Sequence, residues 1–158
     1  MKKVLILFII PFMVGFLGHN LTFAVNRTHL KKLKKTKRCN RCNLSRAKLN
    51  GAKLVRARLR GANLSRAKLR GAKLRSADLR SANLGRADLS RANLRFAKMR
   101  QANLRGANLR GANLRGADLR YSKLRGANFK GANLTGAKLK GAKGGNFKGA
   151  RGVKKGRR

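Results

Sequence analysis

The most constraining feature of this chain is a five-residue repeat that runs without a break from residue 42 to residue 141. Residues 105–120 show it clearly: RGANLRGANLRGADLR, in which alanine, a polar residue and leucine are followed by two variable residues. Leucine stands at the centre of eighteen of the twenty units, and alanine two positions earlier in eighteen. A fixed period of this kind decides the fold more strongly than local propensity does.

A period of five fits neither regular secondary structure. On an α-helix, five residues advance by about 500°, so the leucines would spiral around the whole surface. On a flat strand, side chains alternate, so successive leucines would point to opposite faces. A path that makes about a quarter-turn every five residues sends every leucine and alanine to one axis, and the glycine that ends ten units suits the corner. Four units then close one coil, which predicts an all-β solenoid of about five coils and about 24 Å.

The units resemble those of the pentapeptide-repeat proteins, whose fold is a right-handed quadrilateral β-helix. Residues 36–49, TKRCNRCNLSRAKL, also resemble the way many bacterial members begin their repeats, with a Cys-x-x-Cys before the first unit. The resemblance covers residues 39–141 and implies the fold, but it implies little about function, since most members have no assigned role. Some members mimic the shape and negative charge of a DNA duplex and so bind DNA gyrase. A net charge of +40 argues against that activity here.

Residues 1–24 have the pattern of a signal for export. Lys2 and Lys3 precede an apolar run at residues 4–17, and small residues lead up to Ala24. We therefore expect an exported protein, located in the periplasm, at the cell surface or outside the cell. An uncleaved signal that anchors the chain in the membrane is the alternative, because the apolar run and its flank could just span a bilayer. The many basic residues after the run resist translocation of the chain that follows, which argues against export.

Residues 25–38 form a basic linker with the signals of a short helix. Thr28 is a residue type that caps helices, and Leu30 and Leu33 follow on one face. We expect this helix to cover the first coil, because an open end of a solenoid exposes unpaired backbone groups.

Residues 142–158 break the repeat and are expected to form a flexible basic tail, in which Phe147 folds back over Leu139. No comparable cap is visible at this end. An uncovered last coil predicts a homodimer through that coil, as in some members of the family that the repeat resembles.

Charge indicates the kind of partner. The chain has 43 Lys and Arg against 3 Asp and Glu, a balance that predicts polyanions such as nucleic acid, anionic polysaccharide or an acidic lipid surface. Residues twenty apart should stack on one face of the rod. One predicted column contains Arg60, Arg80, Arg100, Arg120 and Lys140. Two others contain Arg75, Arg95 and Arg115, and Arg70, Arg110 and Lys130.

Stacked cations repel, by about 0.8 kcal/mol for two unit charges about 5 Å apart in water. The acids are placed to relieve this: Asp78 and Asp118 fall on the face of the first column, and Asp88 is expected on its neighbour. The main functional hypothesis is a non-enzymatic protein that binds polyanions through its arginine columns. The alternative is a structural spacer with no specific ligand.

The sequence predicts no enzyme, no cofactor, no metal site and no small-molecule substrate. It holds no paired carboxylates, no Ser/His/Asp set and no phosphate-binding glycine loop. Cys39 and Cys42 occupy inward positions, where packing is expected, and in an oxidising compartment they can form a disulfide. A zinc site would need more ligands than the two cysteines and His29 supply.

Overall fold

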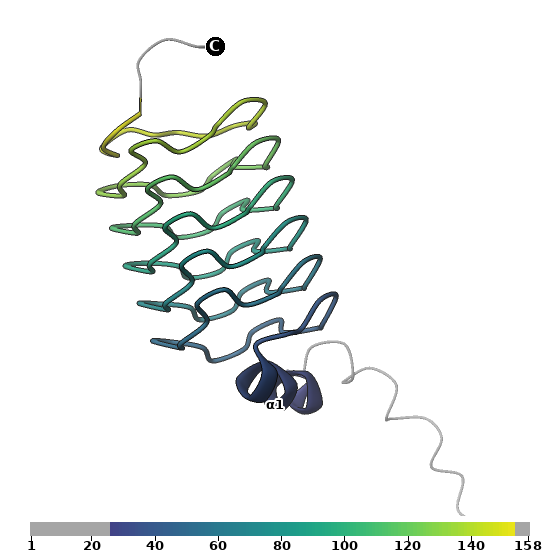
Figure 1. Ribbon diagram of the computed structural model, residues 1–158. Helices are drawn as coiled ribbons and strands as arrows, with labels where there is room; N and C mark the ends of the chain where they lie inside the picture. Colours follow the sequence, from purple (N-terminus) through teal and green to yellow (C-terminus); the bar gives the residue numbers. More distant parts are fainter. Residues whose placement is uncertain (1–25, 154–158) are drawn as a thin grey trace, which may run out of the picture.

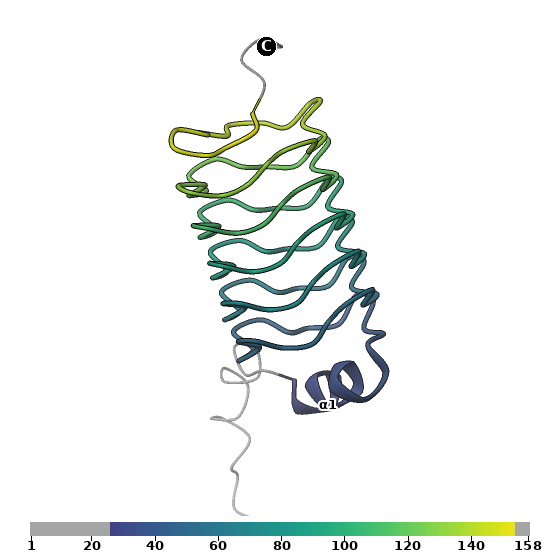
Figure 2. The ribbon, with the colours of Figure 1, turned by 60° about the vertical axis from the view of Figure 1, so that its left-hand side comes forward.

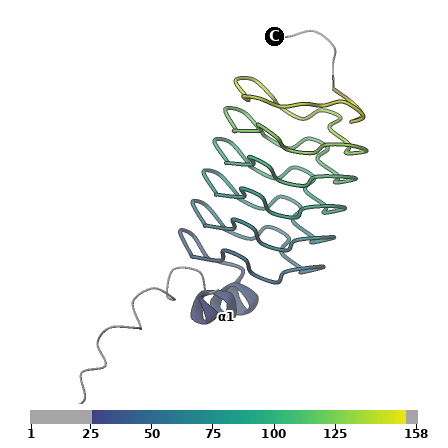
Figure 3. The ribbon, with the colours of Figure 1, turned by 180° about the vertical axis from the view of Figure 1, so that it is seen from behind.

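The computed structural model describes residues 26–153, which form a four-sided rod of stacked coils with a helix at one end (Figure 1). The helix, α1 (Arg27–Thr36), lies beneath the first coil. The coils stack in near-parallel layers along the rod, as the side and rear views show (Figures 2 and 3). Among the described residues the β-structure consists of isolated parallel bridges, each joining one residue to one residue of the next coil.

The spacing between coils is the one that the repeat predicts. Bridges join residues twenty apart, such as Asn63 with Asn83 and Asn83 with Asn103. The Leu64 N–H donates to the Asn83 carbonyl of the next coil (2.7 Å), and the Asn63 N–H donates to the Cys42 carbonyl of the previous coil (2.9 Å). Four units therefore make one coil, and each coil is hydrogen-bonded to both of its neighbours.

The leucine and alanine positions fill the axis of the rod. Every side chain at a leucine position from residue 44 to residue 134 is buried, including Met99 and the bulkier Phe129. Ser122 replaces an alanine and is fully buried, and its hydroxyl donates to the Leu119 carbonyl (2.6 Å), so the polar group is satisfied. The core is thus a narrow column in which each coil packs on the next.

The corners require a left-handed backbone whether or not glycine is present. The last residue of every unit, from Arg46 to Gly141, has a φ between 55° and 73°. Glycine adopts this conformation at no steric cost, whereas other residues are disfavoured there. Half of the units nevertheless end in a residue with a side chain: Arg46, Arg56, Arg66, Ser76, Ser81, Arg86, Arg91, Phe96, Gln101 and Tyr121.

The asparagine or aspartate before the leucine completes the hydrogen bonding of the backbone. In these units, the backbone N–H of the residue after the leucine donates to no backbone carbonyl. In the unit that contains Leu114, for example, the Arg115 N–H donates instead to Asn113 Oδ1 (3.2 Å). Every asparagine or aspartate at this position between residues 43 and 146 makes the same contact. Where lysine takes the position, a neighbouring coil can supply the acceptor, as Asn50 Oδ1 does for the Arg70 N–H (3.1 Å).

Helix α1 covers the first coil. Its N-cap is Asn26, whose side chain accepts the His29 N–H (3.0 Å), so the cap lies two residues before the predicted Thr28. Leu33 points into the core with no exposed surface. The Asn43 N–H donates to His29 Nδ1 (3.2 Å), which ties the helix to the first repeat unit.

At the other end the chain stays on the rod beyond residue 141, where a free tail was expected. Arg151 pairs with Asn133, eighteen residues back instead of twenty, because the last coil is two residues short. Residues 145–149, GNFKG, form one more unit with Phe147 at the leucine position.

Phe147 closes this end of the core in place of a separate cap. Its ring lies 5.1 Å from the Phe129 ring, centroid to centroid, a contact that the sequence did not predict. The residues that pack partly buried against the core here are Ala137, Leu139, Ala142, Phe147, Ala150 and Val153.

Replacing Asn113 by alanine should destabilise the rod by about 0.5–1.5 kcal/mol, because the Arg115 N–H loses its acceptor. Asn113→Asp should retain most of the stability, since the carboxylate also accepts. Lys73→Ala, two coils away in the same column, is the control, because a lysine side chain accepts no hydrogen bond. Urea unfolding measures all three. Equal losses for Asn113→Ala and Lys73→Ala would contradict this role.

Candidate functional site

The register divides the outward side chains into four faces, which we name after one residue of each. In chain order around a coil these are the Asn83 face, the Arg110 face, the Arg95 face and the Arg100 face. Side chains twenty residues apart lie one above the other on each face, about 4.8 Å apart. The predicted columns are therefore present as aligned rows.

The Arg100 face holds the first predicted column: Arg60, Arg80, Arg100, Arg120 and Lys140. Two of its arginines are paired with acids. Arg80 Nε and Nη2 donate to Asp78 Oδ1 and Oδ2 (2.8 and 2.6 Å). Arg120 binds Asp118 in the same two-pronged way (2.8 Å for both contacts). Every second cation along this row, from Arg80 to Arg120, is therefore neutralised by an aspartate.

The two carboxylates respond to these partners. The hydrogen bond from the Arg80 guanidinium is the main cause that lowers the pKa of Asp78 below its ordinary value, and Arg120 lowers the pKa of Asp118 in the same way. Partial burial opposes the shift without cancelling it. Both acids thus relieve cation repulsion, which is the role that the sequence predicts for them.

The Arg95 face carries the second predicted column, Arg75, Arg95 and Arg115, and its outward repeat positions include no acid. Arg95 is half-buried, and its Nε is buried without a hydrogen-bond partner among residues 26–153. Its guanidinium lies over the Phe96 ring, 5.4 Å from the ring centroid. Within residues 26–153, no acidic side chain forms an ion pair with any of the three arginines of this row.

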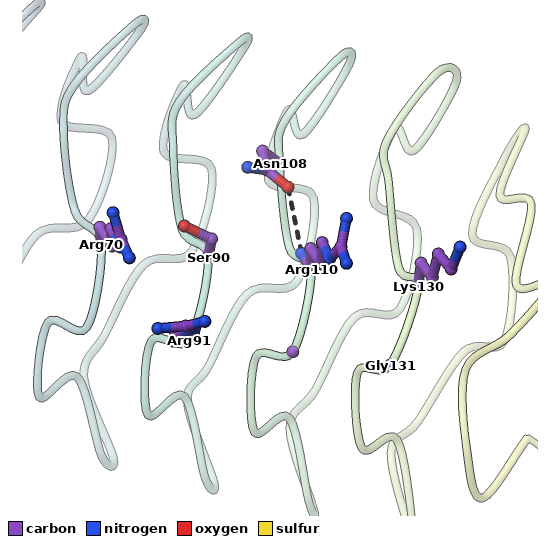
Figure 4. Close-up of a pocket in the computed structure, with 8 residues that line it drawn as sticks. Arg70, Ser90, Arg91, Asn108, Arg110, Lys130 and Gly131 are labelled. Atoms are coloured by element: carbon purple, nitrogen blue, oxygen red, sulfur yellow. Dashed lines mark hydrogen bonds between the residues drawn. The ribbon is translucent and has the colours of Figure 1, made fainter.

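The Arg110 face carries the third column, in which Ser90 replaces an arginine between Arg70 and Arg110 (Figure 4). The shorter side chain leaves an open recess of about 440 Å³. Asp88 lies on this face, two units from Asp78. It therefore belongs to the side opposite the Arg100 face, and its predicted place on a neighbouring face is wrong.

The Asn83 face is the least charged over its first coils. Asn103 Nδ2 donates to Asn83 Oδ1 (3.0 Å), and Asn83 Nδ2 donates to Asn63 Oδ1 (3.4 Å). This ladder links three coils through side chains, as expected for residues twenty apart.

Two exposed aromatic rings flank the Arg100 face at its corners. The Phe96 and Tyr121 side chains are 50% and 46% exposed. Each ring covers the glycine one coil further on: a Cβ on Gly116 would fall 2.6 Å from Phe96, and one on Gly141 would fall 2.5 Å from Tyr121. Arg100 lies over the Tyr121 ring at 5.1 Å, a cation–π arrangement.

A disulfide joins Cys39 and Cys42 in the first coil, next to α1, and both residues are buried. Buried, disulfide-bonded sulfurs stabilise the structure and do not form an exposed thiol centre. Within residues 26–153 no group of three or more His, Cys, Asp or Glu side chains could hold a metal ion. In the same part of the chain, no helix is both long and apolar enough to span a bilayer.

The repeat pattern alone missed two functions of its polar residues. It did not reveal that the Asn or Asp side chain accepts the backbone N–H of the residue two positions later. It also did not reveal that, where this later residue is an arginine, an aspartate lies close enough to pair with its guanidinium. The signal was present as the tripeptide Asp-Leu-Arg, which occurs at Asp78 and Asp118 but not at Asp88.

Comparison with known proteins agrees with this geometry. The family model for pentapeptide repeats matches residues 42–80, 72–111 and 112–143, with eight copies. The chain belongs to the pentapeptide-repeat family. No curated protein sequence matches it significantly.

Solved structures of other family members share the fold. The pentapeptide repeat protein Rfr23 of the cyanobacterium Cyanothece 51142 is 34% identical, with a TM-score of 0.70 over 78% of this chain and 97% of its own. A thylakoid lumen member from Arabidopsis thaliana is 34% identical, with a TM-score of 0.56 over 66% and 70% of the two chains. The plasmid-mediated fluoroquinolone resistance protein QnrB1 is 27% identical, with a TM-score of 0.51 over 66% and 49%.

The paired aspartates should make the stability of the rod depend on acid. A carboxyl whose folded-state pKa is lowered stabilises the fold above its unfolded-state pKa, near 3.9, and the contribution is lost as the pH falls through the folded-state pKa. The double variant Asp78→Asn, Asp118→Asn keeps both backbone acceptors and loses only the ion pairs. Thermal unfolding at neutral pH should therefore show a less stable variant, and the difference should shrink as the pH falls below the ordinary pKa of an aspartate and the parent carboxyls take up protons. A difference that persists in acid would show that the carboxylates act in another way.

Proposed function

We propose that this protein is a non-enzymatic, exported pentapeptide-repeat protein that binds polyanions through the Arg95 and Arg110 faces. The observation that carries the proposal is the row of Arg75, Arg95 and Arg115, which stacks on three successive coils with no acid at the outward positions of its face. The predicted column on the Arg100 face is the weaker candidate, because Arg80 and Arg120 are already engaged.

The charge pattern suits a repeating anion better than a single one. Guanidinium groups held on a rigid row neutralise successive phosphates or sulfates and release their counterions, which gives affinity that depends strongly on salt. Arginine also offers a planar set of donors that fits an oxyanion with two hydrogen bonds. Because the row follows the backbone register, its spacing is fixed before the ligand arrives, and less ordering entropy is lost on binding.

The charge also separates this chain from the DNA mimics of its family. The resistance protein QnrB1 shares the fold at 27% identity. Mimicry of a DNA duplex would require a negative surface. A chain with a formal charge of +40 would attract DNA instead of replacing it. We therefore propose an anionic partner and no gyrase-type activity.

Changing Arg75, Arg95 and Arg115 together to Gln should weaken binding of a short DNA duplex, taken as a generic polyanion. The slope of log affinity against log salt should fall by about one for each arginine that contacts a phosphate, so by about three in all. The control changes Arg41, Arg56 and Arg66 to Gln, which removes equal charge from three different corners of the rod, and Gln101 already shows that Gln fits such a corner. Equal effects of the two triples would favour diffuse attraction, and no effect of either would favour a structural spacer.

Export is the second part of the proposal, and residues 1–24 lie outside the described part of the chain. The order of Lys2, Lys3 and the apolar run supports a signal, and the Cys39–Cys42 disulfide suits an oxidising compartment. We expect the intact mass of the purified mature protein to correspond to a chain that begins near residue 25. A full-length mass in the membrane fraction would establish the uncleaved anchor instead.

A homodimer through the last coil stays a prediction, but the exposed apolar surface at that end is smaller than the sequence indicated. Phe147 packs on Phe129 and so covers part of the end that a partner would need. Sedimentation of the mature chain at several concentrations distinguishes a monomer from a dimer.

A further inference from the structure

The recess on the Arg110 face is built by an interruption in an otherwise regular row. Arg70, Ser90, Arg110 and Lys130 occupy the same position on four successive coils, and only Ser90 is short and uncharged (Figure 4). The gap lies between two arginines about 10 Å apart, since each coil adds about 4.8 Å. A regular row would fill this space with a guanidinium.

Cationic groups surround the gap from several directions. Arg70, Arg110 and Lys130 border it along the row, and Arg91 borders it from the corner beside Ser90. None of the four forms an ion pair among residues 26–153, where the pairs are Arg80 with Asp78 and Arg120 with Asp118.

The polar groups at the recess are held in place by hydrogen bonds of their own. Asp88 Oδ1 accepts the Ser90 N–H (3.0 Å) and Asn108 Nδ2 (3.1 Å), and Asn108 Oδ1 accepts the Arg110 N–H (3.2 Å). These bonds fix the backbone on both sides of the gap and leave the Ser90 hydroxyl able to donate. One carboxylate against four cations leaves the recess with an excess of positive charge.

We propose that this recess binds a compact, multiply charged phosphate group, such as a phosphate monoester or a pyrophosphate. Four cations around one gap favour an anion that concentrates two or more charges, whereas a phosphodiester carries only one. If a longer polyanion carries such a group, binding of the group in the recess fixes the position of the polyanion on the rod. The inference thus rests on the proposed function and adds a specific binding site to it.

Substitution of Ser90 by arginine gives the sharpest test, because charge and shape predict opposite results. Ser90→Arg adds a cation and fills the recess, so we expect the affinity for pyrophosphate to fall. The control is Ser65→Arg, which adds the same charge at the same position of a unit on the Asn83 face, where the Ser65 N–H is likewise held by a side-chain acceptor. Ser65→Arg should leave the affinity equal or slightly higher.

A second pair of variants removes charge without disturbing the corners. Arg91→Gly and Arg86→Gly each delete one cation at a left-handed corner, with φ of 55° in both, where glycine fits. Loss of one charge-assisted hydrogen bond corresponds to about a tenfold change in affinity. We therefore expect Arg91→Gly to weaken pyrophosphate binding about tenfold and Arg86→Gly to change it little.

The measurements are calorimetric titrations of the full chain with sodium pyrophosphate at constant ionic strength, with thermal unfolding as the check on folding. Binding of vesicles that contain phosphatidic acid, compared with phosphatidylglycerol, then separates a lipid monoester from a soluble one as the source. The proposed phosphate site would be contradicted if Ser90→Arg and Ser65→Arg both bound pyrophosphate more tightly than the parent. It would also be contradicted if Arg91→Gly and Arg86→Gly lost equal affinity for pyrophosphate. The proposed function would survive that result if the Arg75, Arg95 and Arg115 triple still lowered the affinity for DNA more than its scattered control.

Discussion

The hydrogen-bonded register between coils is the constraint on which the rest of this structure depends. Backbone hydrogen bonds between the regular coils join residues that are nineteen or twenty-one positions apart. The backbone therefore fixes the height and the direction of every side chain. The leucine and alanine positions have no alternative to the axis, and the remaining positions have no alternative to the surface. A change of register by a single residue would turn leucines outward and expose the core on every side.

The same register forces like side chains into contact with like, which helps amides and opposes cations. The asparagines of the Asn83 face gain a hydrogen-bonded ladder from stacking. Arginines gain only repulsion, and the rod limits it in three ways. Aspartates pair with Arg80 and Arg120, aromatic rings lie against Arg95 and Arg100, and shorter residues such as Ser90 interrupt the rows. The Arg95 face has no aspartate at its outward positions and no interruption between Arg75 and Arg115, which makes its row the most available to an external anion.

The sequence was sufficient for the fold because one period describes most of the chain. The inward set, the twenty-residue spacing and the stacked columns all follow from counting, and the family comparison agrees with them. The ends were harder, because they are not periodic: the Asn26 cap and the Phe147 contact depend on where the chain turns after the repeat. The site was predicted as aligned charges, but alignment does not reveal which charges are already compensated. That required the positions of the Asp78 and Asp118 carboxylates relative to the guanidinium groups.

In a rod with this much positive charge, the binding of an anionic ligand affects the stability of the fold in two opposing ways. A polyanion would relieve repulsion in the folded state, where the cations are held close together, but the unfolded chain carries the same formal charge and also attracts it. Stabilisation by a ligand reflects only the difference between its affinities for the two states. Diffuse attraction should therefore add little to the melting temperature even when binding is tight, because both states share it. Contacts that need the fixed rows or the recess exist only in the folded rod, so a rise in thermal stability is the property that separates a shaped site from simple excess charge.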